Sequence, residues 1–362
     1  MSEEAIVEAS TQTPVQSVTL DQLINIALEQ DASGIHFSQE GRVALRVEGR
    51  FVFVENVDQL SAQVVEEMVN QMLSDEVQLK RLKTVRELDF SYTHSNGVNF
   101  RVNAFYARGN LSVVMRLTSR HVPRMEELGL PEVTKSLLNL SEGLILVTGS
   151  AGSGKSTTIQ SMLEFLNQNF SHHIITIENP IEYLFKSQKS IISQRELGKD
   201  TLSFVNAIQS SSREDPNVVM VSEIRDKETL NAMISLVEMG HLVIGAIPTK
   251  NTRQTIDQIL SLYSPDEHAV MLDRLADALS AILSQDLIDR ADQTGRIAIF
   301  ELLIGTKGVK NIVRHNMLNQ LRTAMESGSA MGMVTMDAYA MQLVERGYIS
   351  QESAGPYLEQ VN

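Results

Sequence analysis

The spacing of apolar residues predicts that the chain begins with an α+β domain. Between Leu20 and Leu28 apolar side chains recur every three or four residues, and Thr19 with Gln22 forms a Thr-x-x-Gln capping box before them. Ser61 is predicted to start a second helix with the same spacing. Around these helices, short stretches alternate between apolar and polar residues, which is the pattern of half-buried strands. The predicted strands span residues 34–37, 43–47, 51–54, 88–92, 98–106 and 111–117.

Turn residues and composition set the limits of this domain. The pairs Asn96-Gly97 and Gly109-Asn110 stand between strands and predict tight hairpin turns, so the last three strands form a meander. Residues 1–17 are rich in Ser, Thr, Gln and Glu and are predicted to be a flexible tail. A proline near its start predicts a linker over residues 121–135. The N-terminal domain is therefore predicted at residues 18–120.

Beyond residue 136 the pattern changes to continuously apolar stretches separated by helical spacers. The predicted strands of this part span residues 144–148, 173–177, 218–221 and 242–247. Such strands, alternating with helices, are typical of a parallel sheet covered on both faces, so an α/β domain is predicted over residues 136–362. After about Ser264 the pattern is helical, with one more strand predicted at residues 296–303.

Composition narrows the class of protein. The chain has 362 residues, of which 43% are hydrophobic, enough for packed cores. Its net charge of −14 argues against nucleic acid as the main partner, because phosphate backbones are held by excess Lys and Arg. It has no cysteine, its first residues are acidic, and it lacks a run of 18 apolar residues. We therefore expect a cytoplasmic protein without a disulfide framework, a Cys-ligated zinc or a secretory signal.

A glycine-rich run directly follows the apolar stretch 144–148 and precedes a predicted helix. It reads Gly-Ser-Ala-Gly-Ser-Gly-Lys-Ser and matches the phosphate-binding loop pattern GxxxxGK[ST]. Its backbone N–H groups and the helix N-terminus suit the phosphates of a nucleoside triphosphate, while Lys155 would reach the β- and γ-phosphates and Ser156 would bind Mg²⁺. A glycine-rich turn that merely starts a helix is the alternative. The predicted nucleotide-binding residues are Gly149, Ser150, Ala151, Gly152, Ser153, Gly154, Lys155, Ser156 and Thr157.

Acidic residues follow two of the predicted strands, at the edge where a parallel sheet places its ligand. Glu178 follows the strand at 173–177 and is predicted to orient or deprotonate the attacking water. Glu223 follows the strand at 218–221 and is predicted to hold Mg²⁺ or its water. Taken alone, each is an ordinary solvated acid, and only the phosphate-binding loop on the same sheet favours a catalytic role.

Four further basic side chains are candidates. His241 precedes the strand at 242–247 and is either a sensor of the γ-phosphate or a histidine bonded to a backbone carbonyl. Arg101, Arg108 and Arg116 lie on the meander of the first domain. Arginine forks match phosphate oxygens, so these three are candidates for neutralising transition-state charge, and a solvated sheet face is the alternative.

Four motifs occur in an order and spacing that resemble the secretion-ATPase superfamily. Residues 143–156, 176–182, 212–226 and 238–243 resemble the Walker A, Asp box, Walker B and His box of its pilus retraction (twitching-motility) ATPases. Further likenesses are found at residues 32–36, 100–103, 108–109 and 332–336. The resemblance therefore covers nearly the whole chain.

The resemblance implies a RecA-like ATPase domain with a smaller PAS-like N-terminal domain. It implies a cytoplasmic homo-hexamer, peripheral at the inner membrane, that acts on pili through a platform protein, with a paralogous retraction ATPase as another candidate partner. It places Glu178 at the attacking water, Ser156 and Glu223 at Mg²⁺, and the three arginines at the nucleotide. Extension ATPases usually carry a cysteine-ligated zinc and a longer N-terminal region, so zero cysteines and this length favour the retraction branch.

The chain departs from the family pattern within the same motifs. Asn179 and Asn217 stand where the family usually has Asp, Ser222 where it has Gly, and Pro248 where it has a second His. Gly34 replaces an Asp of the N-terminal segment, and residues 308–315 keep only part of a retraction-branch motif. An Asp-to-Asn change keeps the shape and removes a charge. We therefore expect intact phosphate binding with turnover reduced by about 10²- to 10³-fold.

Three functional hypotheses follow. The first is an ATP-hydrolysing motor of the pilus retraction type, an accessory paralogue with reduced turnover. The second is a nucleotide-binding structural or regulatory ring subunit that does not hydrolyse ATP. The third is a related motor for secretion or DNA uptake.

Overall fold

The computed structural model describes residues 18–55, 57, 59–73, 75–118 and 122–358. The chain divides into two compact units, Met1–Ser119 and Arg120–Asn362, which are described separately. The tail predicted at residues 1–17 lies outside the described residues. Among the described helices, none has the length and apolar composition that crossing a membrane requires.

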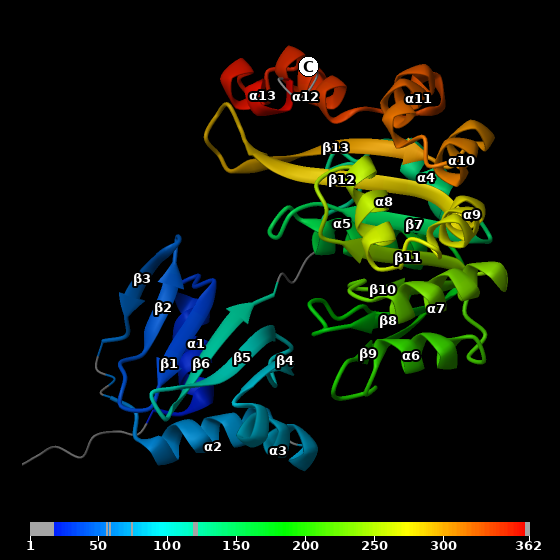
Figure 1. Ribbon diagram of the computed structural model, residues 1–362. Coiled ribbons are helices and arrows are strands. Elements are labelled where there is room, and N and C mark those ends of the chain that lie inside the picture. The colour runs from blue at the N-terminus through cyan, green and yellow to red at the C-terminus, as the bar shows by residue number, and fades with distance from the viewer. Residues whose placement is uncertain (1–17, 56, 58, 74, 119–121, 359–362) are drawn as a thin grey trace, which may run out of the picture. The chain divides into compact units, whose positions relative to one another are not determined.

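The first unit is a six-stranded antiparallel sheet with helices packed on one face (Figure 1). The strand order is β3-β2-β1-β6-β5-β4. Its elements are α1 (Leu20–Glu29), β1 (Gly34–Ser38), β2 (Ala44–Val47), β3 (Arg50–Phe53), α2 (Ala62–Met72), α3 (Glu76–Val85), β4 (Glu87–Thr93), β5 (Asn99–Ala107) and β6 (Asn110–Leu117).

Local sequence explains most of these elements. The capping box of Thr19 and Gln22 forms as predicted, and the Ser61 side chain caps α2. Arg108 and Gly109 both have positive φ and make the tight turn between β5 and β6. Helix α3 is not predicted by the apolar pattern, because only Gln78 and Leu82 of this short helix are buried.

The second unit is a seven-stranded sheet in the order β13-β12-β7-β11-β10-β8-β9 (Figure 1). All pairs are parallel except β12 with β13. Its strands are β7 (Gly143–Thr148), β8 (His173–Glu178), β9 (Ile191–Glu196), β10 (Val218–Val221), β11 (Leu242–Ile247), β12 (Leu279–Asp289) and β13 (Arg296–Ile304). Its helices include α4 (Val133–Leu138), α5 (Lys155–Asn169), α6 (Phe204–Ser211), α7 (Lys227–Glu238), α8 (Thr252–Ser261), α9 (His268–Ala278), α10 (Lys307–Arg314), α11 (Leu321–Ser327), α12 (Met336–Glu345) and α13 (Gln351–Leu358).

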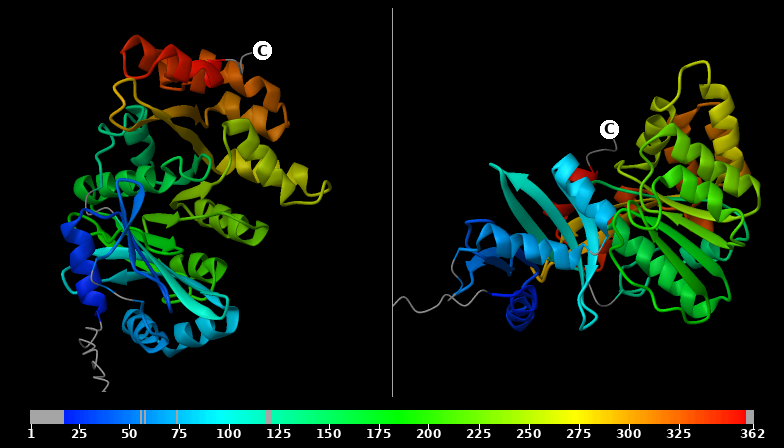
Figure 2. Two further views of the ribbon diagram at one scale, coloured as in Figure 1. Left: turned by 90° about the vertical axis from the view of Figure 1, so that its left-hand side faces the viewer. Right: turned by 90° about the horizontal axis from the view of Figure 1, so that it is seen from below.

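Two apolar cores lie on opposite faces of this sheet. Alternate residues of the central strands face α4 and α5 on one side, and α6 to α11 on the other. In β7, for example, Ile145 and Val147 belong to the first core and Leu144 and Leu146 to the second. Figure 2 shows helices on both faces of the sheet. The predicted α/β fold with a doubly covered parallel sheet is confirmed.

The second unit differs from the prediction in two of its strands and in the predicted linker. Strand β12 lies in a stretch predicted as helical, because its inner position between β7 and β13 buries both faces and removes the alternating pattern. Edge strand β9 is likewise not predicted. Within the predicted linker, Met125 and Leu130 are buried in the core with α5, so this part of the segment packs onto the second unit.

Candidate functional site

The glycine-rich loop joins β7 to α5 at the carboxyl edge of the parallel sheet. Gly149 and Gly154 have φ of +151° and +90°, which disfavour other residues. A Cβ on Gly149 would overlap the Ser153 hydroxyl and the Gln285 backbone carbonyl oxygen. The loop is thus tightly packed, both within its own turn and against strand β12. Its strand, turn and helix are the arrangement that phosphate binding requires.

Lys155 and Ser156 open helix α5 from this loop. The Lys155 ammonium donates to the carbonyl oxygens of Gly149 and Ser150 at 2.7 and 2.8 Å, so it lies inside the loop. Burial lowers the pKa of Lys155, and the nearby Glu223 carboxylate opposes this shift. Ser156 is exposed, so its hydroxyl is accessible beside the loop.

Glu178 ends β8 at the same edge of the sheet and is buried. Its carboxylate accepts hydrogen bonds from Thr176 Oγ1 at 2.6 Å and Gln194 Nε2 at 3.1 Å. Burial raises the pKa of Glu178 to about 7, although the bonds from Thr176 and Gln194 partly oppose this shift. A carboxyl group with a pKa near neutrality suits general-base catalysis.

Glu223 follows β10, which lies one strand nearer to β7 than β8 does. Its carboxylate pairs with Arg225 at 2.6 Å and acts electrostatically on Lys155. Among the described residues no cluster of three or more His, Asp or Glu could hold a metal. Mg²⁺, however, keeps several waters and needs only one or two protein oxygens beside substrate phosphates, and Ser156 and Glu223 are oxygen donors of that kind.

His241 and Asn217 lie at the opposite edge of the sheet. They precede β11 and β10, whose carboxyl ends lie beside the phosphate-binding loop. The six-residue strand β11 spans about 20 Å from edge to edge. His241 Nδ1 bonds the Pro216 carbonyl oxygen at 2.9 Å, and Asn217 Oδ1 accepts from the His173 N–H at 2.8 Å. Within one chain His241 thus matches the second interpretation, a histidine bonded to a backbone carbonyl, because the strand direction carries it away from the loop.

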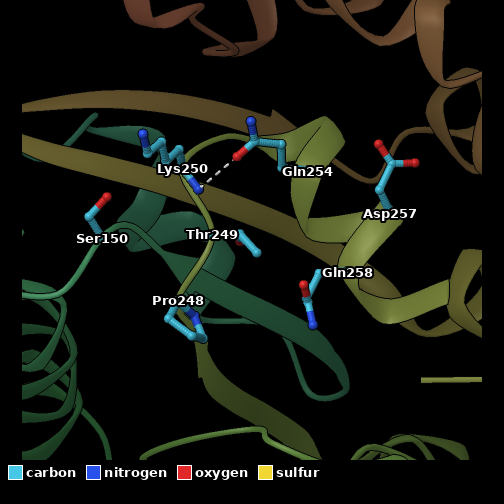
Figure 3. Close-up of a pocket in the computed structure, with 7 residues that line it drawn as sticks. All are labelled: Ser150, Pro248, Thr249, Lys250, Gln254, Asp257 and Gln258. Carbon is cyan, nitrogen blue, oxygen red and sulfur yellow. Dashed lines mark hydrogen bonds between the residues drawn. The ribbon is translucent and has the colours of Figure 1, made fainter. Parts of the chain in front are cut away.

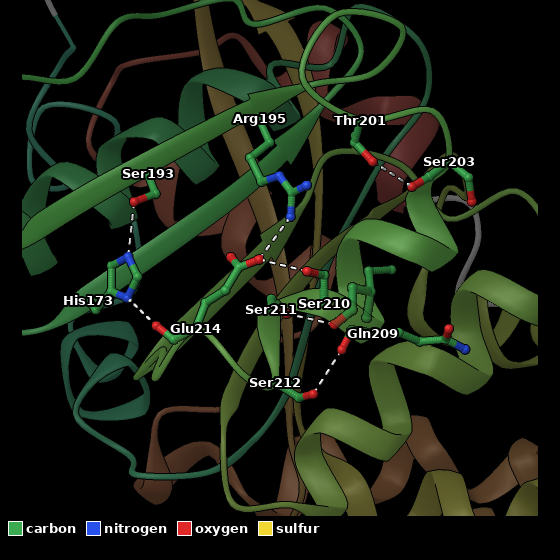
Figure 4. A network of polar contacts seen from close by, with 11 residues as sticks. His173, Ser193, Arg195, Thr201, Ser203, Gln209, Ser210, Ser211, Ser212 and Glu214 are labelled. Atoms are coloured by element: carbon green, nitrogen blue, oxygen red, sulfur yellow. Dashed lines mark hydrogen bonds and ion pairs between the residues drawn. The ribbon is translucent and has the colours of Figure 1, made fainter.

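A polar network fixes the loop that leads into β10 (Figure 4). His173 contacts the Glu214 carbonyl oxygen at 2.9 Å and the Ser193 hydroxyl at 3.0 Å. The Glu214 carboxylate accepts from Arg195 at 3.1 Å and from Ser210 at 2.8 Å. This part of the Walker B-like motif thus joins β8, β9 and α6 through hydrogen bonds.

Three of the other departures of the second unit lie at the loop edge. Asn179, Ser222 and Pro248 follow β8, β10 and β11, respectively. A cavity of about 430 Å³ opens there beside the loop (Figure 3). It is lined by Ser150, Pro248, Thr249, Lys250, Gln254, Asp257 and Gln258. Lys250 is the one cation among the described residues of this lining, and the sequence interpretation missed it.

The three arginines of the first unit occupy two separate places. Arg101 on β5 is directly opposite Arg116 on β6, and Arg101 lies 3.7 Å from Asp89. A cavity of about 290 Å³ is lined by Asp89, Arg101, Asn103, Val114 and Arg116. Arg108 is in the hairpin turn, about 23 Å away along the strand. The structure brings Arg101 and Arg116 together and leaves Arg108 apart from them.

Comparison with known proteins finds relatives among the secretion system proteins and the type IV pilus ATPases. The family model described as "Type II/IV secretion system protein" matches residues 8–354. The chain is 37% identical to the type IV pilus retraction ATPase PilT of Pseudomonas aeruginosa, over 92% of this chain and 96% of that protein. It is 31% identical to the type IV pilus ATPase PilU of the same organism, over 94% and 89% of the two chains.

A solved structure of a pilus retraction motor has the same fold as this chain. The pilus retraction motor PilT with bound ADP superposes with a TM-score of 0.85 at 36% identity, over 94% of this chain and 97% of that one. The order of motifs, the fold and the relatives all lead to one family. The chain belongs to the type II/IV secretion system protein family, among the relatives of the type IV pilus retraction ATPases.

Proposed function

We propose that this protein is an ATP-hydrolysing motor of the pilus retraction type. The observation that carries the proposal is the complete phosphate-binding loop at a sheet edge that also holds Glu178 and Glu223. The ADP bound to PilT, which shares this fold, supports a nucleotide in the same place. The working unit is a homo-hexamer at the cytoplasmic side of the inner membrane. Its partners are a pilus platform protein and a paralogous retraction ATPase, with no nucleic acid.

The chemistry follows from the residues of the loop edge. Backbone N–H groups of residues 149–155 hold the ATP phosphates, and Lys155 turns from the loop carbonyls to the β- and γ-phosphates. Ser156 and Glu223 hold Mg²⁺ or its waters. Glu178 removes a proton from the attacking water, for which its raised pKa is suited.

Arginines of the first unit complete the proposed site in the ring. Arg101 and Arg116 form one basic pair on the sheet and supply charge to a nucleotide held by an ATPase domain. Arg108 is too far from that pair to act on the same phosphate group. The proposed division remains a tail at 1–17, an N-terminal domain at 18–120, a linker at 121–135 and an ATPase domain at 136–362.

Turnover is proposed to be reduced rather than lost. Asn179 and Pro248 lie at the loop edge, where one lacks a carboxylate and the other lacks an N–H donor. Asn217 lies at the opposite edge and contributes nothing to this loss. The second candidate, a nucleotide-binding ring subunit without hydrolysis, is favoured by the same two departures.

One experiment tests for ATP hydrolysis and distinguishes the motor from the non-hydrolysing ring subunit. The full-length protein is assayed for Mg²⁺-dependent ATP hydrolysis and for ATP binding, next to the variants Lys155→Ala and Lys80→Ala. Lys80 is an exposed lysine of α3 and serves as the control. The motor requires hydrolysis that disappears in Lys155→Ala and persists in Lys80→Ala. Equal rates of ATP hydrolysis by both variants overturn the proposal. ATP binding without hydrolysis by the unmodified protein identifies the regulatory subunit.

A further inference from the structure

Strand β12 places a buried amide directly under the phosphate-binding loop. Gln285 is 1% exposed, and its Nε2 donates to the Ser153 carbonyl oxygen at 2.6 Å. Its Oε1 is buried and finds no hydrogen-bond partner in the described part of the chain. A buried amide that leaves one atom unpaired costs free energy, so its remaining bond to the loop calls for a functional reason.

The orientation of one peptide group supplies that reason. The Ser153 carbonyl and the Gly154 N–H belong to the same planar trans peptide, so they point in opposite directions. The bond from Gln285 holds the Ser153 carbonyl toward β12. The Gly154 N–H is consequently turned away from β12, toward the side of the loop where phosphate oxygens are held in loops of this kind.

Contacts around the glycines prevent the loop from rotating this peptide. A Cβ built on Gly154 would lie 3.1 Å from Gln285 Nε2, so the amide packs against the loop backbone. The Gln285 backbone carbonyl also lies next to Gly149. One residue earlier, Ser284 accepts a hydrogen bond from Thr148 at 2.9 Å, and this bond joins β12 to β7 without involving the Ser153–Gly154 peptide.

We propose that Gln285 is a positioning residue that orients the Ser153–Gly154 peptide for binding of the nucleotide β-phosphate. This inference rests on the proposed function. Gln285 does not touch the nucleotide but fixes a donor in advance, which reduces the ordering cost of binding. Because ADP and ATP share the β-phosphate, the effect applies equally to both nucleotides.

The test compares three variants of the full-length protein with a control on the same strand. Gln285→Met keeps the length and removes the donor, Gln285→Glu replaces the donor by an acceptor, and Gln285→Asn keeps the amide but shortens its reach. Ser284→Ala removes a buried hydrogen bond next to the loop and is the matched control. Dissociation constants for ADP and for the Mg²⁺–ATP complex are measured by calorimetry below the melting temperature of each variant.

The expected result is affinity about tenfold weaker for both nucleotides in the folded Gln285 variants, consistent with the loss of one hydrogen bond. Ser284→Ala should lower the melting temperature and leave both dissociation constants unchanged. Unchanged dissociation constants in the Gln285 variants, with or without lower melting temperatures, overturn the inference. If the unmodified protein binds neither nucleotide, the proposed function itself fails, so the two failures are distinguishable.

Discussion

The two edges of the central sheet carry residues of the same family motifs and serve different purposes. At the carboxyl edge lie the glycine-rich loop after β7, Glu178 at the end of β8 and Glu223 just after β10. At the amino edge, His241, Asn217 and the Glu214 network join strands and loops through hydrogen bonds to backbone groups. We therefore expect a departure from the family pattern to affect catalysis only where it follows a strand, at the loop edge, and not where it precedes one.

The largest difference in kcat between changes at the two edges is expected when a carboxylate is replaced at each edge. Glu178→Gln should lower kcat for ATP by at least about 10²-fold, because the base for the attacking water is removed. In the unmodified protein kcat should rise as pH increases through about 7, since Glu178 must be ionised to accept a proton. The measurement is the steady-state rate between pH 6 and 8.5.

The matched control is Glu214→Gln, a half-buried carboxylate in the loop before β10. It should leave kcat and the pH profile unchanged. An equal loss in both variants, or a rising limb that persists in Glu178→Gln, would contradict the assignment of the base.

An intermediate effect is expected when single departures are reversed. Pro248→His should raise kcat about tenfold, because it returns a donor to the loop edge, beside Ser150. Asn217→Asp should leave kcat unchanged, because residue 217 lies at the opposite edge of the sheet. The measurement is kcat for ATP hydrolysis by each of the two single variants. A larger gain in kcat from Asn217→Asp than from Pro248→His would refute the division between the edges.

The smallest effect is expected for the histidine of the amino edge. His241→Ala should leave kcat within about twofold and reduce the free energy of unfolding by about 1 kcal/mol, the usual net contribution of one hydrogen bond. Urea unfolding and the ATPase assay measure the two quantities. A loss of activity without a loss of stability would restore a catalytic role for His241.

Sequence alone predicted the loop edge well because its signals are local. Glycines before Lys155, and acids directly after apolar strands, can be read without knowing which strands are neighbours. The position of Glu178 and Glu223 at the loop edge follows from the parallel order of the strands.

The remaining features could not be predicted from local pattern. The place of His241 before a strand left two interpretations open, and the hydrogen bond to the Pro216 carbonyl that matches one of them depends on the fold. Strand β12 is buried on both sides, so its apolar pattern resembles that of a helix, and Gln285 could not be connected with the loop. The pairing of Arg101 with Arg116 depends on strand register, which the spacing of three arginines does not specify.

The most direct test is a crystal structure of the full-length protein with Mg²⁺ and a slowly hydrolysed ATP analogue. We expect the triphosphate on the backbone N–H groups of residues 149–155, with Ser156 at the metal and His241 still bonded to the Pro216 carbonyl. A triphosphate bound at the amino edge of the sheet, or the His241 of the same chain within hydrogen-bond distance of the γ-phosphate, would contradict it.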